Sequence, residues 1–384
     1  MHPTGPVARR FPLVARIRPA CLPLKARVGR LRELADTASQ QADPGQASTV
    51  FNQTALLASD LGLPDYAREL CHRHADLYLP RSPLPAMSAI RGLEPIVNLA
   101  RLHIRAGHHQ RGHQLLLDLY RSVTNTTETV LDGITVPAEL TATDDQRAEV
   151  RAWLWRVVLA DGTRALTAAG RWKDALRHIE EHRGIGRRIL DGRQVAVLAA
   201  VTADDRPGAL ALLEDTEPGD AWEDAVTVVL TALCRPGDRH AAEKAIGHWL
   251  ALDDAEGLAV FHTRLALTAF DAAGPDTPAA RNLLRQLTRR TSESGDGYAT
   301  RDLLSHPGVR ARLDTCTATA LERALAACAL DSGALPAALR RGLDDSLDGA
   351  GKVLENNPFD PGSPGGNPLE QGRRTAPSSD ASSP

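Results

Sequence analysis

The sequence predicts an all-α protein, a right-handed α-solenoid built from antiparallel helix pairs and interrupted by a small β-hairpin. Three observations support this prediction. Two amphipathic helical stretches fill residues 47–80 and are joined by a turn at 61–65. The same order of helix, turn and helix then recurs along the chain. Aromatic residues make up only 4% of the sequence, which favours helices that pack on small side chains. A repeated helix pair buries its apolar face by stacking on its neighbours, as solenoids do.

The spacing of small residues defines the repeat. In each predicted pair, the turn is followed by a small residue at which the second helix approaches the first closely. These residues are Ala67, Gly112, Ala175, Ala209, Ala242 and Ala279. They are separated by 45, 63, 34, 33 and 37 residues. The last three intervals are close to the period of about 34 residues that is typical of helix–turn–helix repeats.

The clearest turn is Ala-Ala-Gly-Arg-Trp-Lys-Asp-Ala at residues 168–175. In this segment the chain resembles the tetratricopeptide repeat family, whose repeats have a similar turn and second-helix start. Phe51 takes the family's aromatic position on a first helix, and Ala100 takes a small position. Four positions depart from the family pattern: Thr54, Gly162, His74 and His182. The resemblance covers about residues 47–290 and implies a helical-hairpin solenoid with degenerate repeats.

The interval of 63 residues contains an insertion, which falls mostly in residues 122–146. Inside it, Asp132 and Gly133 stand between β-branched residues at 129–136, a pattern that predicts a β-hairpin. Insertions in solenoids often collect on the binding face. The alternative is a tolerated surface loop, because long insertions cost little free energy.

The two ends of the chain differ in composition from the middle. Residues 1–32 carry eight Lys or Arg and no acidic residue, so we expect a poorly ordered basic arm. Contact of this arm with nucleic acid or an anionic surface is the alternative. The helix pairs should occupy residues 33–347, with capping helices at 311–347. Residues 351–384 contain 16 Pro, Gly or Ser among 34, which predicts a disordered tail.

Composition also predicts a cytoplasmic protein. The five cysteines are scattered and no two have CxxC spacing, which argues against a disulfide framework or a structural zinc site. No apolar run approaches the length of a membrane span. Arg9 and Arg10 are followed by further basic residues rather than by the apolar stretch that an export signal needs.

One helical motif has the order of a zinc hydrolase site. His178, Glu181 and His182 spell H-x-x-E-H, and Glu256 is a downstream carboxylate that could serve as a third ligand. The motif, however, lies in the second helix of the clearest repeat, where these side chains should pack between helices. A further group of histidines is expected to lie on turns and helix surfaces: His103, His108, His109 and His113. We therefore expect no metal and no cofactor, and keep a zinc-dependent hydrolase as an unfavoured alternative.

The sequence points to binding rather than catalysis. It contains no G-x-S-x-G, no P-loop and no dinucleotide-binding glycine motif. The tetratricopeptide resemblance implies that first helices line a concave groove that holds a peptide or protein partner. The groove candidates carried over by position are Asn52, Asp60, Glu94, Arg101, Arg105, Arg164, Asp191 and Gln194. The arginines favour an acidic or C-terminal carboxylate partner. We thus expect a non-catalytic regulatory or scaffolding module, and a sensor of a peptide or small ligand is the alternative.

Overall fold

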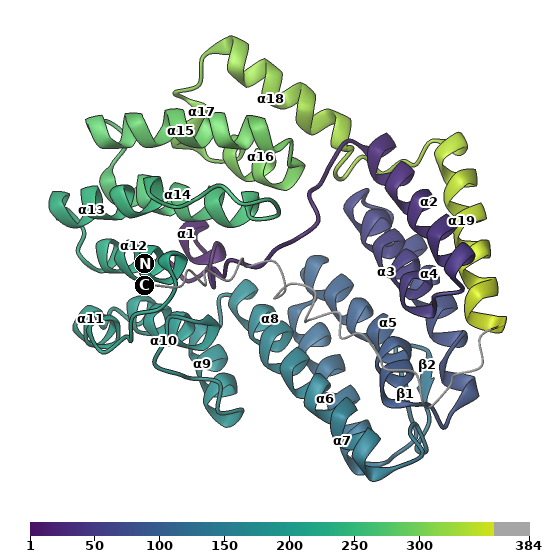
Figure 1. Ribbon diagram of the computed structural model, residues 1–384. Coiled ribbons are helices and arrows are strands. Elements are labelled where there is room, and N and C mark those ends of the chain that lie inside the picture. Colours follow the sequence, from purple (N-terminus) through teal and green to yellow (C-terminus); the bar gives the residue numbers. More distant parts are fainter. Residues whose placement is uncertain (357–384) are drawn as a thin grey trace, which may run out of the picture.

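A computed structural model describes residues 1–356 of the chain. The predicted disordered tail lies outside the described residues, except that the last helix continues through residues 351–356. The described protein is all-helical apart from one two-stranded sheet (Figure 1). The elements are α1 (Pro6–Arg9), α2 (Leu24–Gln41), α3 (Pro44–Asp60), α4 (Pro64–Asp76), η1 (Leu79–Arg81), α5 (Ala86–Arg105), α6 (His109–Asn125), β1 (Thr129–Leu131), β2 (Ile134–Val136), α7 (Asp144–Val157), η2 (Val158–Gly162), α8 (Thr163–Ala168), α9 (Trp172–Glu181), α10 (Asp191–Thr202), α11 (Arg206–Glu214), α12 (Ala221–Cys234), α13 (Arg239–Leu250), α14 (Ala259–Ala273), α15 (Pro278–Ser294), α16 (Gly297–Leu304), α17 (Pro307–Arg310), α18 (Thr315–Cys328) and α19 (Ala337–Asn356).

Each of the six predicted turns lies between two helices that pack against each other. The pairs are α3 with α4, α5 with α6, α8 with α9, α10 with α11, α12 with α13 and α14 with α15. Gly62, Gly107 and Gly170 follow the C-caps of α3, α5 and α8 and have positive φ angles, which glycine adopts at little cost. A Cβ atom at Gly112 would lie 2.7 Å from the carbonyl oxygen of Ala100, so α5 and α6 approach too closely for a side chain there.

The small residues predicted for the close approaches are buried in the first five pairs. In the sixth pair the prediction is wrong by one position, because Ala280 is fully buried and Ala279 only partly. Side-chain caps set where several second helices begin. Asp205 and Asp238 accept hydrogen bonds from backbone N–H groups of α11 and α13, and Thr277 does the same for α15.

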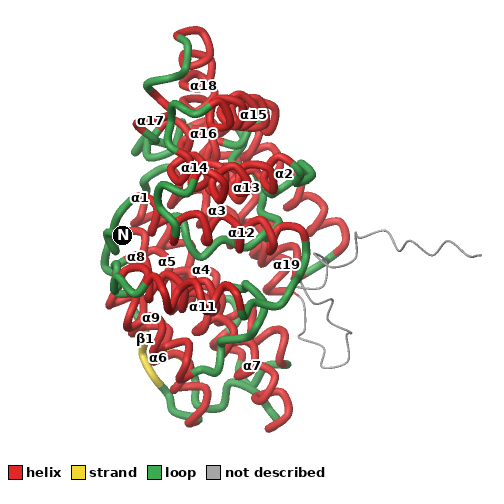
Figure 2. Tube along the Cα trace, turned by 90° about the vertical axis from the view of Figure 1, so that its left-hand side faces the viewer, coloured by secondary structure: helices red, strands yellow, loops and turns green. Residues whose placement is uncertain are grey.

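The hairpin predicted in the insertion is confirmed. β1 pairs antiparallel with β2, and Asp132 and Gly133 form the turn with φ angles of 50° and 90°. The hairpin is held firmly, because the side chain of Asp132 is only 5% exposed and accepts hydrogen bonds from Arg68, His103 and Arg111. Figure 2 shows β1 beside α6, among elements that are otherwise helical.

The buried apolar residues form two large clusters. Each cluster also contains residues from a segment that is distant in the sequence. One cluster joins α2–α7 and includes Leu347 and Leu354 of α19. The other joins α8–α18 and includes Phe11 and Leu13 near the beginning of the chain. The beginning of the sequence thus completes the core of the later helices, and its last described helix completes the core of the earlier ones.

The expectation of a poorly ordered arm at residues 1–32 is wrong for these residues. Phe11 and Leu13 are buried, and α2 buries Leu24, Val28 and Leu31. The prediction counted charges and overlooked the apolar side chains among them. Phe11 and Leu13 belong to the cluster that joins α8–α18, and the three apolar residues of α2 belong to a smaller third cluster. Burial of each such side chain contributes about 1.5–3 kcal/mol.

The predicted capping helices at 311–347 do not cover one surface together. α18 packs on α16, whereas α19 packs on α2 and α3 at the other side of the array. The loop before α19 strengthens this second contact, because Asp331 and Gly333 donate backbone hydrogen bonds of 2.7 Å to the carbonyl oxygens of Asp60 and Leu61. The described helices therefore close on themselves. Within residues 1–356, none is both long and apolar enough to span a bilayer.

Candidate functional site

Residues 10–22 cross the middle of the helical array as a stretched coil between α1 and α2 (Figure 1). We call this segment the strap. The residues that surround it lie mainly on the first helices of the pairs and on α16. We call their strap-facing side the inner face, which comprises Asp60, Asp161, Arg164, Asp191, Gln194, Arg264, Asp271 and Gly297.

Gln194 on α10 binds the main chain of the strap. Its Oε1 accepts a hydrogen bond of 2.7 Å from the backbone N–H of Leu13, and its Nε2 donates one of 2.7 Å to the carbonyl oxygen of Leu13. Nε2 also donates to the carbonyl oxygen of Ile189 at 2.8 Å. Gln194 is completely buried. An amide placed in this way binds an extended backbone irrespective of its side chains, in the manner of a strand partner.

Other backbone contacts hold the strap further along. The N–H of Arg18 donates to the carbonyl oxygen of Gly257 at 3.1 Å, and the N–H of Gly297 donates to the carbonyl oxygen of Cys21 at 2.8 Å. The side chains of Phe11 and Leu13 are buried in the cluster that joins α8–α18. The strap is therefore bound as a peptide would be, by backbone hydrogen bonds together with apolar anchors.

Two arginines of the strap meet carboxylates of the inner face. Arg10 pairs with Asp271 of α14 at 2.7 Å, and Arg16 pairs with Asp191 of α10 at 2.6 Å. Burial alone would raise the pKa of Asp271, but the hydrogen bond from His306 and the charge of Arg10 outweigh it and lower this pKa. The Arg10 pair is enclosed, while both members of the Arg16 pair are substantially exposed, so the second contributes less.

Asp60 connects four helices at the end of the strap. Its side chain, which is 2% exposed, accepts hydrogen bonds from Arg27 of α2, Arg105 of α5 and Tyr298 of α16. Arg105 donates at 2.9 Å to Asp60 and also at 2.7 Å to Ser59. Burial, and after it the negative charge of Asp60, raise the pKa of Tyr298, which stays a hydrogen-bond donor.

The π-helical turn η2 brings Asp161 to the inner face. Arg101 of α5 donates to Asp161 from Nη2 at 2.7 Å and from Nε at 3.2 Å, and Arg164 lies 3.6 Å from the same carboxylate. The Asp161 side chain is 6% exposed. The Arg164 side chain is 53% exposed. Partial desolvation lowers the pKa of Arg164; Asp161 opposes this shift, whereas the neighbouring charges of Arg101 and Arg16 add to it. Single π-helical turns within α-helices are frequent at functional sites.

Arg18 of the strap differs from its neighbours because no described carboxylate pairs with its guanidinium. Arg18 is an exposed residue; partial desolvation, followed by the charges of Arg164, Arg264 and Arg16, lowers the pKa of Arg18 to about 10. Arg264 itself pairs with Asp302 at 2.6 Å. Arg16 and Arg164 likewise have carboxylate partners, Asp191 and Asp161.

The remaining groove candidates form a smaller polar group on α3 and α5. Asn52 donates a hydrogen bond of 2.7 Å to Glu94 and accepts one of 3.0 Å from Asn98. Burial raises the pKa of Glu94, against the opposing effect of the hydrogen bond from Asn52. Asn98 also accepts a hydrogen bond of 3.0 Å from Arg101, which links this group to Asp161.

Each of the eight groove candidates has a partner within the chain, and four of them, Asp60, Arg164, Asp191 and Gln194, belong to the inner face. The sequence analysis missed the strap residues Arg10, Leu13, Arg16 and Arg18, and their partner Asp271. Two signals could have found the strap: its apolar residues alternate around Pro12, and its arginines outnumber nearby acids.

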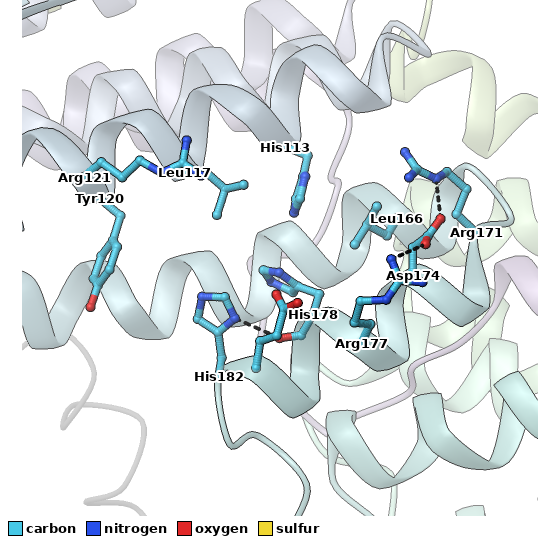
Figure 3. Close-up of a pocket in the computed structure, with 11 residues that line it drawn as sticks. His113, Leu117, Tyr120, Arg121, Leu166, Arg171, Asp174, Arg177, His178 and His182 are labelled. Atoms are coloured by element: carbon cyan, nitrogen blue, oxygen red, sulfur yellow. Dashed lines mark hydrogen bonds and ion pairs between the residues drawn. The ribbon is translucent and has the colours of Figure 1, made fainter.

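The H-x-x-E-H motif lies at a separate cavity of about 410 Å³ between α6 and α9. Figure 3 shows His113 of α6 directed toward His178 of α9 and His182, which caps the end of α9. His178 donates from Nε2 to the carbonyl oxygen of Val158 at 3.0 Å, and His182 donates from Nδ1 to the carbonyl oxygen of His178 at 2.7 Å. Among residues 1–356 no three His, Cys, Asp or Glu side chains are arranged to hold a metal ion.

These histidines predict an acid-sensitive contact between α6 and α9. Burial, followed by the charges of His178 and Arg171, lowers the pKa of His113 to about 4, and burial also lowers the pKa of His178. The unfolded chain therefore takes up protons first, and stability that is complete above pH ~6.5 falls as the pH drops toward ~4. In urea unfolding at several pH values, His113→Gln should reduce this slope by up to about 1.4 kcal/mol per pH unit. His240→Gln, at an exposed position, is the matched control, and an unchanged slope in His113→Gln would contradict the prediction.

Comparison of the chain with protein-family models, with curated proteins and with solved structures gives no match.

Proposed function

We propose that this chain is a non-catalytic protein-interaction module, an α-solenoid of tetratricopeptide type whose inner face binds an extended segment of a protein partner. The observation that carries the proposal is the double hydrogen bond between buried Gln194 and the main chain of Leu13. It supports binding of an extended backbone by this face. Because backbone recognition is independent of side chains, the same amide serves any segment that enters in the same register.

The arrangement of the helix pairs supports the solenoid. First helices α3, α8, α10 and α14 supply most of the polar residues of the inner face, and each second helix packs against its own first helix. The tetratricopeptide resemblance implies the same arrangement, in which the first helices line the binding face. Solenoids present such faces to extended partners.

The charged residues of the inner face and of α5 indicate which side chains a partner segment should carry. The expectation of an acidic partner rested on Arg101, Arg105 and Arg164, but Asp161 and Asp60 already pair with these arginines. Asp191 and Asp271, by contrast, receive their arginines from the strap. The partner segment should therefore carry apolar anchors with arginine beside them.

A regulatory or scaffolding role in the cytoplasm fits this activity. All five cysteines are free thiols, as expected in a reducing compartment.

Photo-crosslinking tests the proposed function. A photoreactive amino acid replaces Leu190, which is 45% exposed beside Asp191, or Val130, which is 66% exposed on the hairpin. In cells that naturally contain this chain, the Leu190 probe should yield a discrete protein adduct and the Val130 probe should not. The absence of any adduct at Leu190, or equal adducts at both positions, would contradict binding at the inner face.

A further inference from the structure

Two cysteines that are 307 positions apart in the sequence lie in contact near the end of the strap. Cys21 belongs to the strap, and Cys328 is the last residue of α18. The thiol of Cys328 donates a hydrogen bond of 3.2 Å to the carbonyl oxygen of Cys21, and the thiol of Cys21 donates one to the Sγ of Cys328. Figure 1 shows the strap passing the end of α18 on its way to α2. The fold therefore places these two thiols side by side, and both residues are 1% exposed.

The other three cysteines lie elsewhere. Cys71 and Cys234 belong to different apolar clusters, and Cys316 is exposed near the start of α18. Cys316 is separated from Cys328 by about 18 Å along the helix axis. The contact between Cys21 and Cys328 is thus a property of the fold rather than of a cysteine-rich sequence.

Hydrogen bonds make the two thiols unequal. Arg27 of α2 donates from Nη1 to the Sγ of Cys21 at 3.5 Å. The hydrogen bond from Cys21 lowers the pKa of Cys328 against the opposing effect of burial, and the same bond, followed by burial, raises the pKa of Cys21. Because the thiolate is the nucleophilic form of cysteine, Cys328 is the thiol that reacts first.

Gly297, the first residue of α16, allows this close approach. A Cβ atom there would lie 2.7 Å from the Sγ of Cys328 and 3.1 Å from the carbonyl oxygen of Cys21. The N–H of Gly297 donates to that same carbonyl oxygen at 2.8 Å. A larger residue at this position would therefore push the strap and the end of α18 away from α16.

We propose that Cys21 and Cys328 form a redox site, at which hydrogen peroxide converts the two thiols into a disulfide that fastens the strap to α18. The Cys328 thiolate attacks one oxygen of the peroxide and the O–O bond breaks, which gives a sulfenic acid and a hydroxide that takes up the thiol proton. The Sγ of Cys21 then attacks the Sγ of Cys328, and the sulfenic hydroxyl leaves with the Cys21 proton as water. Two thiols are oxidised, and one peroxide is reduced to two water molecules. A small oxidant suits thiols that are only 1% exposed.

The disulfide would join two sides of the array. Cys21 lies directly before α2, which packs on α3 and α19, whereas α18 packs on α16. In the reduced protein, hydrogen bonds hold the strap at this point. A covalent bond there would keep the strap in place and oppose its local opening. This inference goes beyond the proposed function and does not depend on it.

Peptide mapping by mass spectrometry tests the site on the full chain. After treatment with hydrogen peroxide and blocking of free thiols with a maleimide in urea, the protein should keep three of its five thiols and link Cys21 to Cys328. Cys328→Ser should lose this linked peptide pair. Cys316→Ser, which removes the exposed thiol of the same helix, is the matched control and should keep the pair. A protein that retains all five thiols, or that links Cys316 as often as Cys21, would overturn the proposal.

A glycine variant tests the geometry without removing a sulfur atom. Gly297→Ala should form about tenfold less disulfide in the same time, because disulfides need a specific separation of the two residues. Gly247→Ala is the control, because an added Cβ in that part of α13 meets nothing within 4 Å, and it should oxidise as wild type does.

Hydrogen exchange gives a second readout on the unmodified chain. Oxidation should slow exchange of the Gly297 amide about tenfold, because the disulfide holds its acceptor in place, and should leave buried Val197 of α10 unchanged. Equal disulfide yields in Gly297→Ala and wild type, conversion of Cys328 to a sulfinic acid without any disulfide, or an unchanged Gly297 amide would each contradict the proposal.

Discussion

Asp60→Ala should destabilise the protein by about 4 kcal/mol, the cost of breaking a buried ion pair. The Asp60 carboxylate is 2% exposed, and it neutralises Arg27, whose side chain is 12% exposed. Its removal leaves the Arg27 guanidinium enclosed without a counter-charge and leaves Tyr298 without its acceptor. The bonds from the loop before α19 go to backbone carbonyl oxygens of Asp60 and Leu61, which Asp60→Ala retains, so the expected loss comes from the side chain alone.

Equilibrium unfolding in urea measures this loss of stability, and two further variants test its cause. Asp60→Asn keeps the shape and one acceptor, so it should cost less than Asp60→Ala but still about 2 kcal/mol or more. Asp348→Asn is the matched control, because Asp348 is 63% exposed and its pair with Arg73 at 2.7 Å is a surface pair worth at most about 1 kcal/mol. If Asp60→Ala and Asp348→Asn lower the free energy of unfolding equally, the Asp60 carboxylate does not hold α2, α5 and α16 to α3.

The helix pairs could be predicted because their signals are local. A glycine with positive φ follows the first helix of each of the first three pairs, and a small residue comes at a fixed offset after it, so a short window of sequence contains both. The hairpin was predictable for the same reason, since Asp132 and Gly133 alone determine its turn. The error of one position at Ala279 shows the limit, because burial at a helix face depends on the neighbour that packs there.

The strap and the closure of the array could not be predicted in this way. Leu13 bonds to Gln194 across 181 positions, and Arg10 bonds to Asp271 across 261. No local pattern predicts which distant carboxylate an arginine pairs with. The eight basic residues of segment 1–32, which contains no acidic residue, were therefore interpreted as a solvent-exposed arm. The groove positions follow from the helix phase and stay a prediction, whereas their partners within the chain could not be predicted from it.

The second large effect is expected for Gln194→Leu, which should lower the free energy of unfolding by about 3 kcal/mol or more. The substitution keeps a side chain of similar size but leaves three buried backbone groups without partners: the N–H and the carbonyl oxygen of Leu13 and the carbonyl oxygen of Ile189. Each unsatisfied buried group costs about 1–3 kcal/mol. The strap should detach before the helices unfold, because two of the three bonds belong to it.

Trypsin reports that detachment directly. Arg16 is followed by Ile17, and Gln194→Leu should make this bond a fast cleavage site while far-ultraviolet circular dichroism stays helical. Gln110→Leu, at an exposed position of α6, is the control and should change unfolding free energy by less than about 0.5 kcal/mol. If Gln194→Leu is as stable as this control and its strap stays uncut, the amide of Gln194 does not hold the strap. A strap that is cut while the helices remain folded would mean that the inner face exists without its occupant, which is the condition that binding of a partner segment requires.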